Sequence, residues 1–209
     1  MKSEHLIDRL VEEHDATSPM TMAQGRLAAG VAALGSVIVI LWLSGLRLDI
    51  AAGRPSPLVL LSAGLFGLGA LASGWAATRL AQPAVGGSQG GALWMVGAIG
   101  LLPAISLIEY LLGNHAPTST GAALRCLSFG LGASIVTFAV LGLRLRRGAP
   151  VLPERAGLFA GLSAGSVGAF AVTLECNYDG LAHLTLGHVA IVAAMALAGR
   201  YGLARWIRW

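Results

Sequence analysis

Charged residues are scarce in this sequence, since Asp, Glu, Lys and Arg make up 11% of its 209 residues, whereas about 25% is usual for a soluble domain. This shortage excludes a soluble globular enzyme and a disordered chain. Cysteine is scarce too: two residues cannot form a zinc-finger pattern or a multi-bridge scaffold. Apolar residues, at 56%, and 29 glycines are abundant instead. This balance indicates a polytopic membrane protein.

Six apolar stretches follow a polar N-terminal segment, at about residues 26–46, 57–79, 92–112, 123–143, 156–175 and 182–204. Each has about the 20 residues that a helix needs to cross the hydrocarbon core of a bilayer. Strands are excluded because the runs lack period-two alternation, and an open sheet edge would leave backbone groups unpaired in lipid. The sequence therefore predicts an all-α bundle of six transmembrane helices over residues 26–209, preceded by a separate segment, residues 1–25.

The basic residues predict how this bundle is oriented. With the N-terminus inside, eleven Lys and Arg residues fall on the inner side, and only Arg47, Arg54 and Arg125 fall outside. Cytoplasmic loops are rich in Lys and Arg, so both termini are expected in the cytoplasm. The net charge of +4 does not indicate direct nucleic-acid binding, because the basic residues stand at the ends of the apolar runs and form no single patch.

Glycine in the fifth stretch has a helical period. Gly157, Gly161 and Gly165 recur at every fourth position and therefore share one face of a helix. Lipid gives no hydrophobic drive for helix association, and small faces let helix backbones approach closely. We expect this face to pack against another helix.

The N-terminal segment combines an apolar face with acidic residues. Leu6, Ile7, Leu10 and Val11 share one face of a short helix. A helix of about 12 residues is marginal alone in water, so it is expected to fold against a partner. Five acidic residues surround this face and would be repelled by an anionic leaflet. The pattern favours a basic protein with an apolar groove over the lipid surface, and docking onto the chain's own Arg-rich inner loops is a third interpretation.

The two cysteines stand 50 residues apart, and the predicted topology places both at the outer, periplasmic ends of the fourth and fifth spans. A disulfide between Cys126 and Cys176 is feasible where both face the seam of this hairpin. Thiolates and imidazoles could also hold a soft or borderline metal there, and small buried cysteines can simply serve packing. Polar neighbours accompany the two cysteines: Glu109, His115, Glu175, Asn177, Asp179 and His183.

The chain resembles the NrsF-like family of bacterial inner-membrane anti-sigma factors, which restrain an extracytoplasmic-function sigma factor of the sigma-F type. The resemblance covers nearly the whole length. Its carriers are Leu6-Ile7-Asp8-Arg9-Leu10, Gly45-Leu46-Arg47-Leu48-Asp49-Ile50-Ala51, Arg125-Cys126-Leu127, Leu143-Arg144-Leu145-Arg146-Arg147-Gly148-Ala149-Pro150, Gly157-Leu158-Phe159-Ala160-Gly161-Leu162-Ser163-Ala164-Gly165 and Leu174-Glu175-Cys176-Asn177.

The resemblance implies six transmembrane helices that form a sensor domain, a cytoplasmic sigma-binding segment, and two cysteines, Cys126 and Cys176, that sense oxidative or heavy-metal stress. Where the family often has His-Cys, this chain has Glu175-Cys176, which favours thiol redox chemistry over direct metal ligation. No resident metal or cofactor is expected. For metal sensing, the expected ligands are Cys126, Cys176, Glu175 and His183.

The leading hypothesis is thus a multi-pass anti-sigma factor of the bacterial inner membrane, in contact with the lipid bilayer and with an extracytoplasmic-function sigma factor. Leu6, Ile7, Leu10 and Val11 would fill a groove on that sigma factor. We expect no enzymatic activity and no catalytic residue. A membrane thiol oxidoreductase is one alternative, although relay chemistry generally needs a second thiol pair. A small transporter is the other, although no charged residue lies near the centre of a span.

Overall fold

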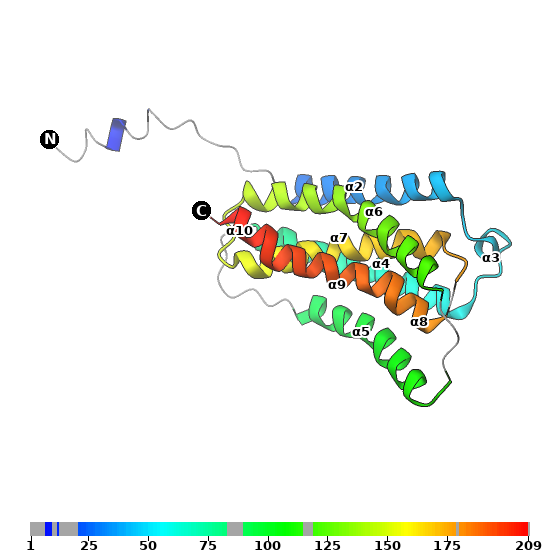
Figure 1. Ribbon diagram of the computed structural model, residues 1–209. Coiled ribbons are helices and arrows are strands. Elements are labelled where there is room, and N and C mark those ends of the chain that lie inside the picture. Colours follow the sequence, from blue (N-terminus) through cyan, green and yellow to red (C-terminus); the bar gives the residue numbers. More distant parts are fainter. Residues whose placement is uncertain are drawn as a thin grey trace.

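The computed structural model describes residues 7–9, 12, 21–82, 90–114, 119–178 and 180–208. Within these ranges the chain is helical and has no strand. Six helices are long and apolar enough to cross a membrane, which confirms the predicted all-α bundle (Figure 1). They are α2 (Met22–Ser44), α4 (Pro57–Leu80), α5 (Gly90–Leu111), α6 (Thr120–Arg146), α7 (Pro153–Glu175) and a sixth span, Leu181–Ile207.

The sixth span is not a uniform α-helix. It consists of α8 (Leu181–His183), the π-helical turn η1 (Leu184–Val189), α9 (Ala190–Leu197), a second π-helical turn η2 (Ala198–Leu203) and α10 (Ala204–Ile207). A short helix, α3 (Leu48–Ala51), lies in the connection between α2 and α4. The two π-helical turns make the sixth span the least regular of the six. Such turns are rare and frequently occur at functional sites.

The first span begins four residues earlier than the sequence predicts, at Met22. The reason is a capping box: the Thr21 hydroxyl accepts a hydrogen bond from the Gln24 backbone amide at 3.2 Å, and the Gln24 side chain accepts one from the Thr21 amide at 3.0 Å. These two bonds satisfy amides that have no partner inside the helix. The other predicted boundaries agree with the observed ones to within three residues.

Helix α7 is the central element of the bundle. Of its most apolar 18-residue window, 83% is buried, against 17–44% for the other five spans. The predicted glycine face explains this position. A Cβ atom at Gly157 would overlap the carbonyl oxygen of Gly199, and one at Gly161 would overlap that of Met195. The backbones of α7 and the sixth span therefore approach as closely as expected, which larger side chains would prevent.

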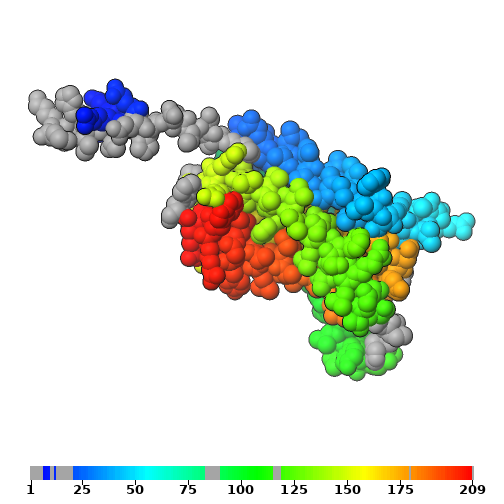
Figure 2. All heavy atoms as spheres, turned by 45° about the horizontal axis from the view of Figure 1, so that its top comes forward, coloured from blue at the N-terminus to red at the C-terminus, as the bar shows by residue number. Residues whose placement is uncertain are grey.

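The outer surface of the bundle is apolar. Trp42 and Trp94 are each 82% exposed, and many leucines on α2, α4 and α5 are exposed as well. Soluble monomers rarely carry such large apolar surfaces, whereas lipid tails solvate them. Helix α5 leans away from the other spans and protrudes from the bundle (Figures 1 and 2).

The bundle has two chemically different ends. At one, α2 and α7 end and α6 begins; this is called the cysteine end, because Cys126 and Cys176 lie there. At the opposite end, called the basic end, α2 begins and the sixth span finishes (Figure 1). Among the described residues, the basic end carries nine arginines: Arg26, Arg79, Arg144, Arg146, Arg147, Arg155, Arg200, Arg205 and Arg208. The cysteine end carries three: Arg47, Arg54 and Arg125.

The N-terminal segment is described in part. Ile7, Asp8, Arg9 and Glu12 are helical and exposed, and the side chain of Ile7 is 57% exposed. Leu6, Leu10 and Val11, the other three residues of the predicted apolar face, lie outside the described residues.

Candidate functional site

Two thiols meet at the cysteine end. The Sγ atoms of Cys126, in the second turn of α6, and Cys176, which directly follows α7, lie 3.2 Å apart. Both cysteines are free and buried, with 1% and 3% exposure. A disulfide would have a sulfur–sulfur distance of about 2.05 Å, so this is an S–H···S contact in which Cys126 donates. That hydrogen bond holds the pKa of the Cys176 thiol below its ordinary value of 9.0.

Two imidazoles complete a four-residue cluster with these thiols. Nε2 of His183 lies 3.2 Å from the Cys176 sulfur, and the rings of His183 and His188 lie edge to face with centroids 5.4 Å apart. Each of the four residues offers one ligand atom, and these atoms all lie within 4.8 Å of one another. All four residues are buried. We call Cys126, Cys176, His183 and His188 the Cys2His2 cluster.

A hydrogen bond to Thr173 fixes the proton on one of these rings. The Thr173 hydroxyl lies 2.7 Å from the Ala169 carbonyl oxygen, to which it donates, and 2.8 Å from Nδ1 of His188. A hydroxyl has a single proton, so its oxygen must accept from Nδ1–H of His188. The lone pair of that neutral ring is then on Nε2, which has no hydrogen-bond partner among the described residues.

His188 has no place in the sequence-based interpretation, and the π-helical turn η1 explains why. With 3.6 residues per turn, two residues five positions apart on an α-helix lie about 140° apart around the axis. The π-helical turn joins residues i and i+5, so residue i+5 lies nearly above residue i. The turn therefore brings His188 over His183. The only sequence signal was the His-x4-His spacing, which has meaning once the helix type is known.

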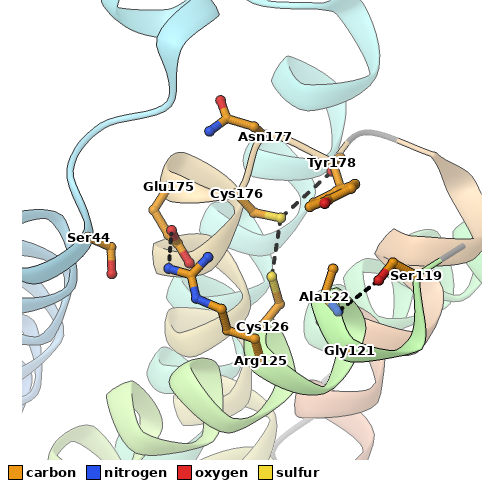
Figure 3. Close-up of a pocket in the computed structure, with 10 residues that line it drawn as sticks. All are labelled: Ser44, Ser119, Gly121, Ala122, Arg125, Cys126, Glu175, Cys176, Asn177 and Tyr178. Carbon is orange, nitrogen blue, oxygen red and sulfur yellow. Dashed lines mark hydrogen bonds and ion pairs between the residues drawn. The ribbon is translucent and has the colours of Figure 1, made fainter.

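The predicted neighbours of the cysteines divide into two groups. His183 joins the Cys2His2 cluster, whereas Glu175 lies outside it: its carboxylate is 3.5 Å from the Arg125 guanidinium (Figure 3). Glu175 is the last residue of α7, and its side chain is directed toward α6 and Arg125. Asn177 accepts a hydrogen bond from the Leu48 amide at 3.2 Å. His115 and Asp179 lie outside the described residues.

The cysteines are accessible from the cysteine end through a pocket of about 440 Å³ (Figure 3). Its lining includes both cysteines together with Arg125 and Glu175. A larger cleft of about 940 Å³ lies between α5 and the start of the sixth span, and His183, Glu109 and Tyr110 line it. The buried Cys2His2 cluster thus borders both open spaces, since Cys126 and Cys176 line the first and His183 lines the second.

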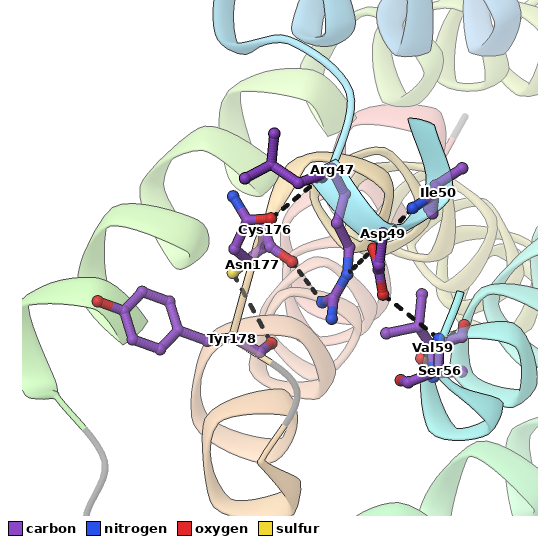
Figure 4. A network of polar contacts seen from close by, with 10 residues as sticks. Arg47, Asp49, Ile50, Ser56, Val59, Cys176, Asn177 and Tyr178 are labelled. Carbon is purple, nitrogen blue, oxygen red and sulfur yellow. Dashed lines mark hydrogen bonds and ion pairs between the residues drawn. The ribbon is translucent and has the colours of Figure 1, made fainter. Parts of the chain in front are cut away.

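The connection between α2 and α4 is tied to the backbone of Cys176 by Arg47 (Figure 4). The buried Arg47 guanidinium donates to the Cys176 carbonyl oxygen at 2.6 Å and to the Asp49 carboxylate at 2.6 Å. The Arg47 amide also donates to the Leu174 carbonyl oxygen at 2.9 Å. The hydrogen bond from Arg47 is the main reason that the pKa of Asp49 lies below its ordinary value of 3.8. Arg47 therefore links the backbone at Cys176 to the connection that follows α2.

The family model described as NrsF, negative regulator of sigma F, matches residues 10–209, which is nearly the whole chain. No curated protein and no solved structure matches.

Proposed function

Because the chain belongs to the NrsF family of negative regulators of sigma F, we propose that it holds an extracytoplasmic-function sigma factor at the bacterial inner membrane. Release follows when the thiols of Cys126 and Cys176 respond to an oxidant or a heavy metal. The observation that carries this proposal is the contact of the two thiols with each other and, through the Cys176 carbonyl, with Arg47. The protein acts by binding and not by catalysis.

The N-terminal segment is the sigma-binding element. Ile7 is exposed on a helical stretch, next to Asp8, and Leu6, Leu10 and Val11 extend the same apolar face in the sequence. An amphipathic helix that lays such a face into a groove is a common mode of peptide recognition. The acidic residues would pair with basic sigma-factor surfaces that otherwise meet DNA or core polymerase.

The unequal number of arginines at the two ends of the bundle supports the proposed orientation. Among the described residues, nine arginines at the basic end against three at the cysteine end support a cytoplasmic basic end. The N-terminal segment leads into α2 at the basic end, where a sigma factor is available. The cysteine end then faces the periplasm, whose oxidising conditions permit thiol chemistry.

Helix α2 connects the two ends and is fixed at both. At the basic end, the Arg26 guanidinium lies 3.4 Å from the centroid of the Trp75 ring, and Gly25 packs directly against Arg144. At the cysteine end, Arg47 holds the Cys176 backbone. The helix has 23 residues and spans about 35 Å. A displacement of Cys176 can thus shift α2 and the segment attached to its start.

The energy that this coupling needs is small. A tenfold change in sigma affinity corresponds to about 1.4 kcal/mol. Hydrogen bonds to charged groups contribute about 1.5–3 kcal/mol each. Gain or loss of the single bond between Arg47 and the Cys176 carbonyl is therefore sufficient, provided that the sigma-bound and sigma-free states differ in that bond.

Sigma binding is tested with the full-length protein in lipid nanodiscs and purified extracytoplasmic-function sigma factors of the source organism. Leu10→Asp places a charge on the apolar face and is expected to abolish retention of the cognate sigma factor. Ala16→Asp adds the same charge within the same segment, away from that face, and is the matched control. Failure of the wild-type protein to retain any of these sigma factors would refute the proposed function.

Coupling is tested by comparing sigma affinity before and after oxidation or metal addition. Arg47→Met removes the bond to Cys176 and is expected to abolish the difference between the two states. Arg54→Met removes an exposed arginine from the same connection and should leave the difference intact. An equal response in Arg47→Met and wild type would exclude Arg47 as the link.

A further inference from the structure

We infer that the Cys2His2 cluster is a closed, four-coordinate binding site for a borderline or soft divalent cation of the zinc and cadmium class. Its ligands are Cys126 Sγ, Cys176 Sγ, His183 Nε2 and His188 Nε2. The histidine at position 188, five residues after His183, takes the place that Glu175 has in the sequence-based set. The cluster is therefore a metal site built by three helices, α6, α7 and the sixth span.

The distances suit a tetrahedral ion. With metal bonds of 2.0–2.3 Å, the ligand atoms of a tetrahedral zinc site lie roughly 3.3–3.8 Å apart. In the structure the two sulfurs are 3.2 Å apart, the Cys176 sulfur and His183 Nε2 are also 3.2 Å apart, and no pair of the four ligand atoms exceeds 4.8 Å. Adjustments of about an ångström or less, mainly by side-chain rotation, bring all four to tetrahedral spacing.

An unpaired ring nitrogen of His188 points to a ligand. Its Nε2 atom is buried and has no hydrogen-bond partner within the described part of the chain. Burying an unpaired polar atom is costly. Because Thr173 holds the proton of His188 on Nδ1, the free Nε2 is a lone pair aimed into the cluster. A metal-ligating histidine typically has its other nitrogen hydrogen-bonded in this way.

The donor set defines the class of cation. Two thiolates and two imidazoles select zinc, cadmium or cobalt over the hard cations magnesium and calcium, which prefer oxygen ligands. Four protein ligands leave no open position, which is typical of structural zinc sites and not of catalytic ones. Binding displaces the thiol protons, so both sulfurs become thiolates. The cation enters through the pocket lined by both cysteines.

The regulatory consequence rests on the proposed function. A bound ion would hold the start of α6, the end of α7 and η1 together. The position of Cys176 would in turn affect Arg47, which donates a hydrogen bond to the Cys176 carbonyl oxygen. Metal occupancy would thereby set the position of α2 and the affinity for sigma. The site itself does not depend on this role, because metal binding can be measured without a sigma factor.

Cobalt titration of the full-length protein in nanodiscs, reduced and stripped with a chelator, tests the site. We expect one Co²⁺ per chain, with the visible d–d absorption of tetrahedral cobalt and thiolate-to-cobalt charge transfer in the near ultraviolet. Zinc or cadmium should displace it. Cys126→Ser should weaken the charge-transfer band, and His188→Ala should lower the affinity at least about tenfold. Glu175→Gln is the matched control and should bind as wild type.

The wild-type protein gives a second measurement that does not depend on the folding of variants. Bound zinc should protect both cysteines from alkylation, and a prior disulfide formed with diamide should abolish cobalt binding. Octahedral cobalt, or wild-type affinity in both His183→Ala and His188→Ala, would overturn the proposed ligand set. A normal metal titration without any change in sigma affinity would leave the metal site standing and refute only its role in release.

Discussion

Thr173→Val is the most selective change to the proposed metal site, because it alters no ligand and nearly preserves side-chain volume. In the wild type, the Thr173 oxygen accepts from Nδ1–H of His188 at 2.8 Å. Valine offers no acceptor. The ring must then either leave Nδ1–H buried and unpaired or move the proton to Nε2, which removes the lone pair that faces the sulfurs.

The expected loss of metal affinity follows from what such outer partners contribute. Their removal typically costs 10–100-fold in affinity, or about 1.4–2.7 kcal/mol. The assay is competition for Zn²⁺ between the nanodisc-embedded protein and a chromophoric chelator, with thermal stability of the metal-free protein measured in parallel. Thr173→Ser keeps the hydroxyl and should bind within a few-fold of wild type. Equal zinc affinity in Thr173→Val and wild type would refute the assignment of His188 Nε2 as a ligand.

Three further predictions concern packing, thiol reactivity and pH. Gly161→Ala should destabilise the bundle by about 1–3 kcal/mol, because the new methyl group meets the sixth-span backbone. Gly132→Ala, with no described atom within 4 Å of its Cβ position, should stabilise it by about 0.5–1 kcal/mol. Thermal unfolding of both variants in detergent compares these effects, and shifts of equal sign would contradict the described packing. Cys176 should react with iodoacetamide faster than Cys126 in the reduced, metal-free protein, since the pKa of Cys176 is lowered. If mass spectrometry finds Cys126 modified first, the donor and the acceptor of the S–H···S bond between the two cysteines are the reverse of those assigned. Asp49 has a lowered pKa, so its stabilising effect is present above its ordinary pKa of 3.8 and is lost as the pH falls through the lower folded value. The difference in melting temperature between wild type and Asp49→Asn should therefore shrink in that range. A pH-independent difference would exclude the Arg47 bond as its source.

The thiol pair illustrates how far the sequence reaches. That Cys126 and Cys176 lie at one end follows from counting spans, because each crossing reverses the direction of the chain. That their sulfurs lie 3.2 Å apart depends on the rotation of α6 and α7 about their axes, which neighbouring helices set. Counting spans predicts at which end of the bundle each cysteine lies, but not which neighbouring helix its side chain faces.

Arg47 and His188 show the opposite case. Arg47 counted in the sequence as one of three outer basic residues, and its bond to the Cys176 carbonyl joins positions 129 residues apart. A contact between side chain and distant backbone leaves no local pattern. The proximity of His188 to His183 likewise depends on the π-helical turn, since regular α-helical spacing would place the two residues on different sides of the span.

The sequence by itself determined the six apolar helices, their approximate ends and the glycine face of α7, because hydropathy, helix length and residue size act over a turn or two of one helix. The tertiary structure alone decided that α7 occupies the centre, that Glu175 faces Arg125, and that two histidines meet two cysteines. These features depend on how helices rotate and deform when their side chains pack together, and that outcome is a property of all the contacts at once.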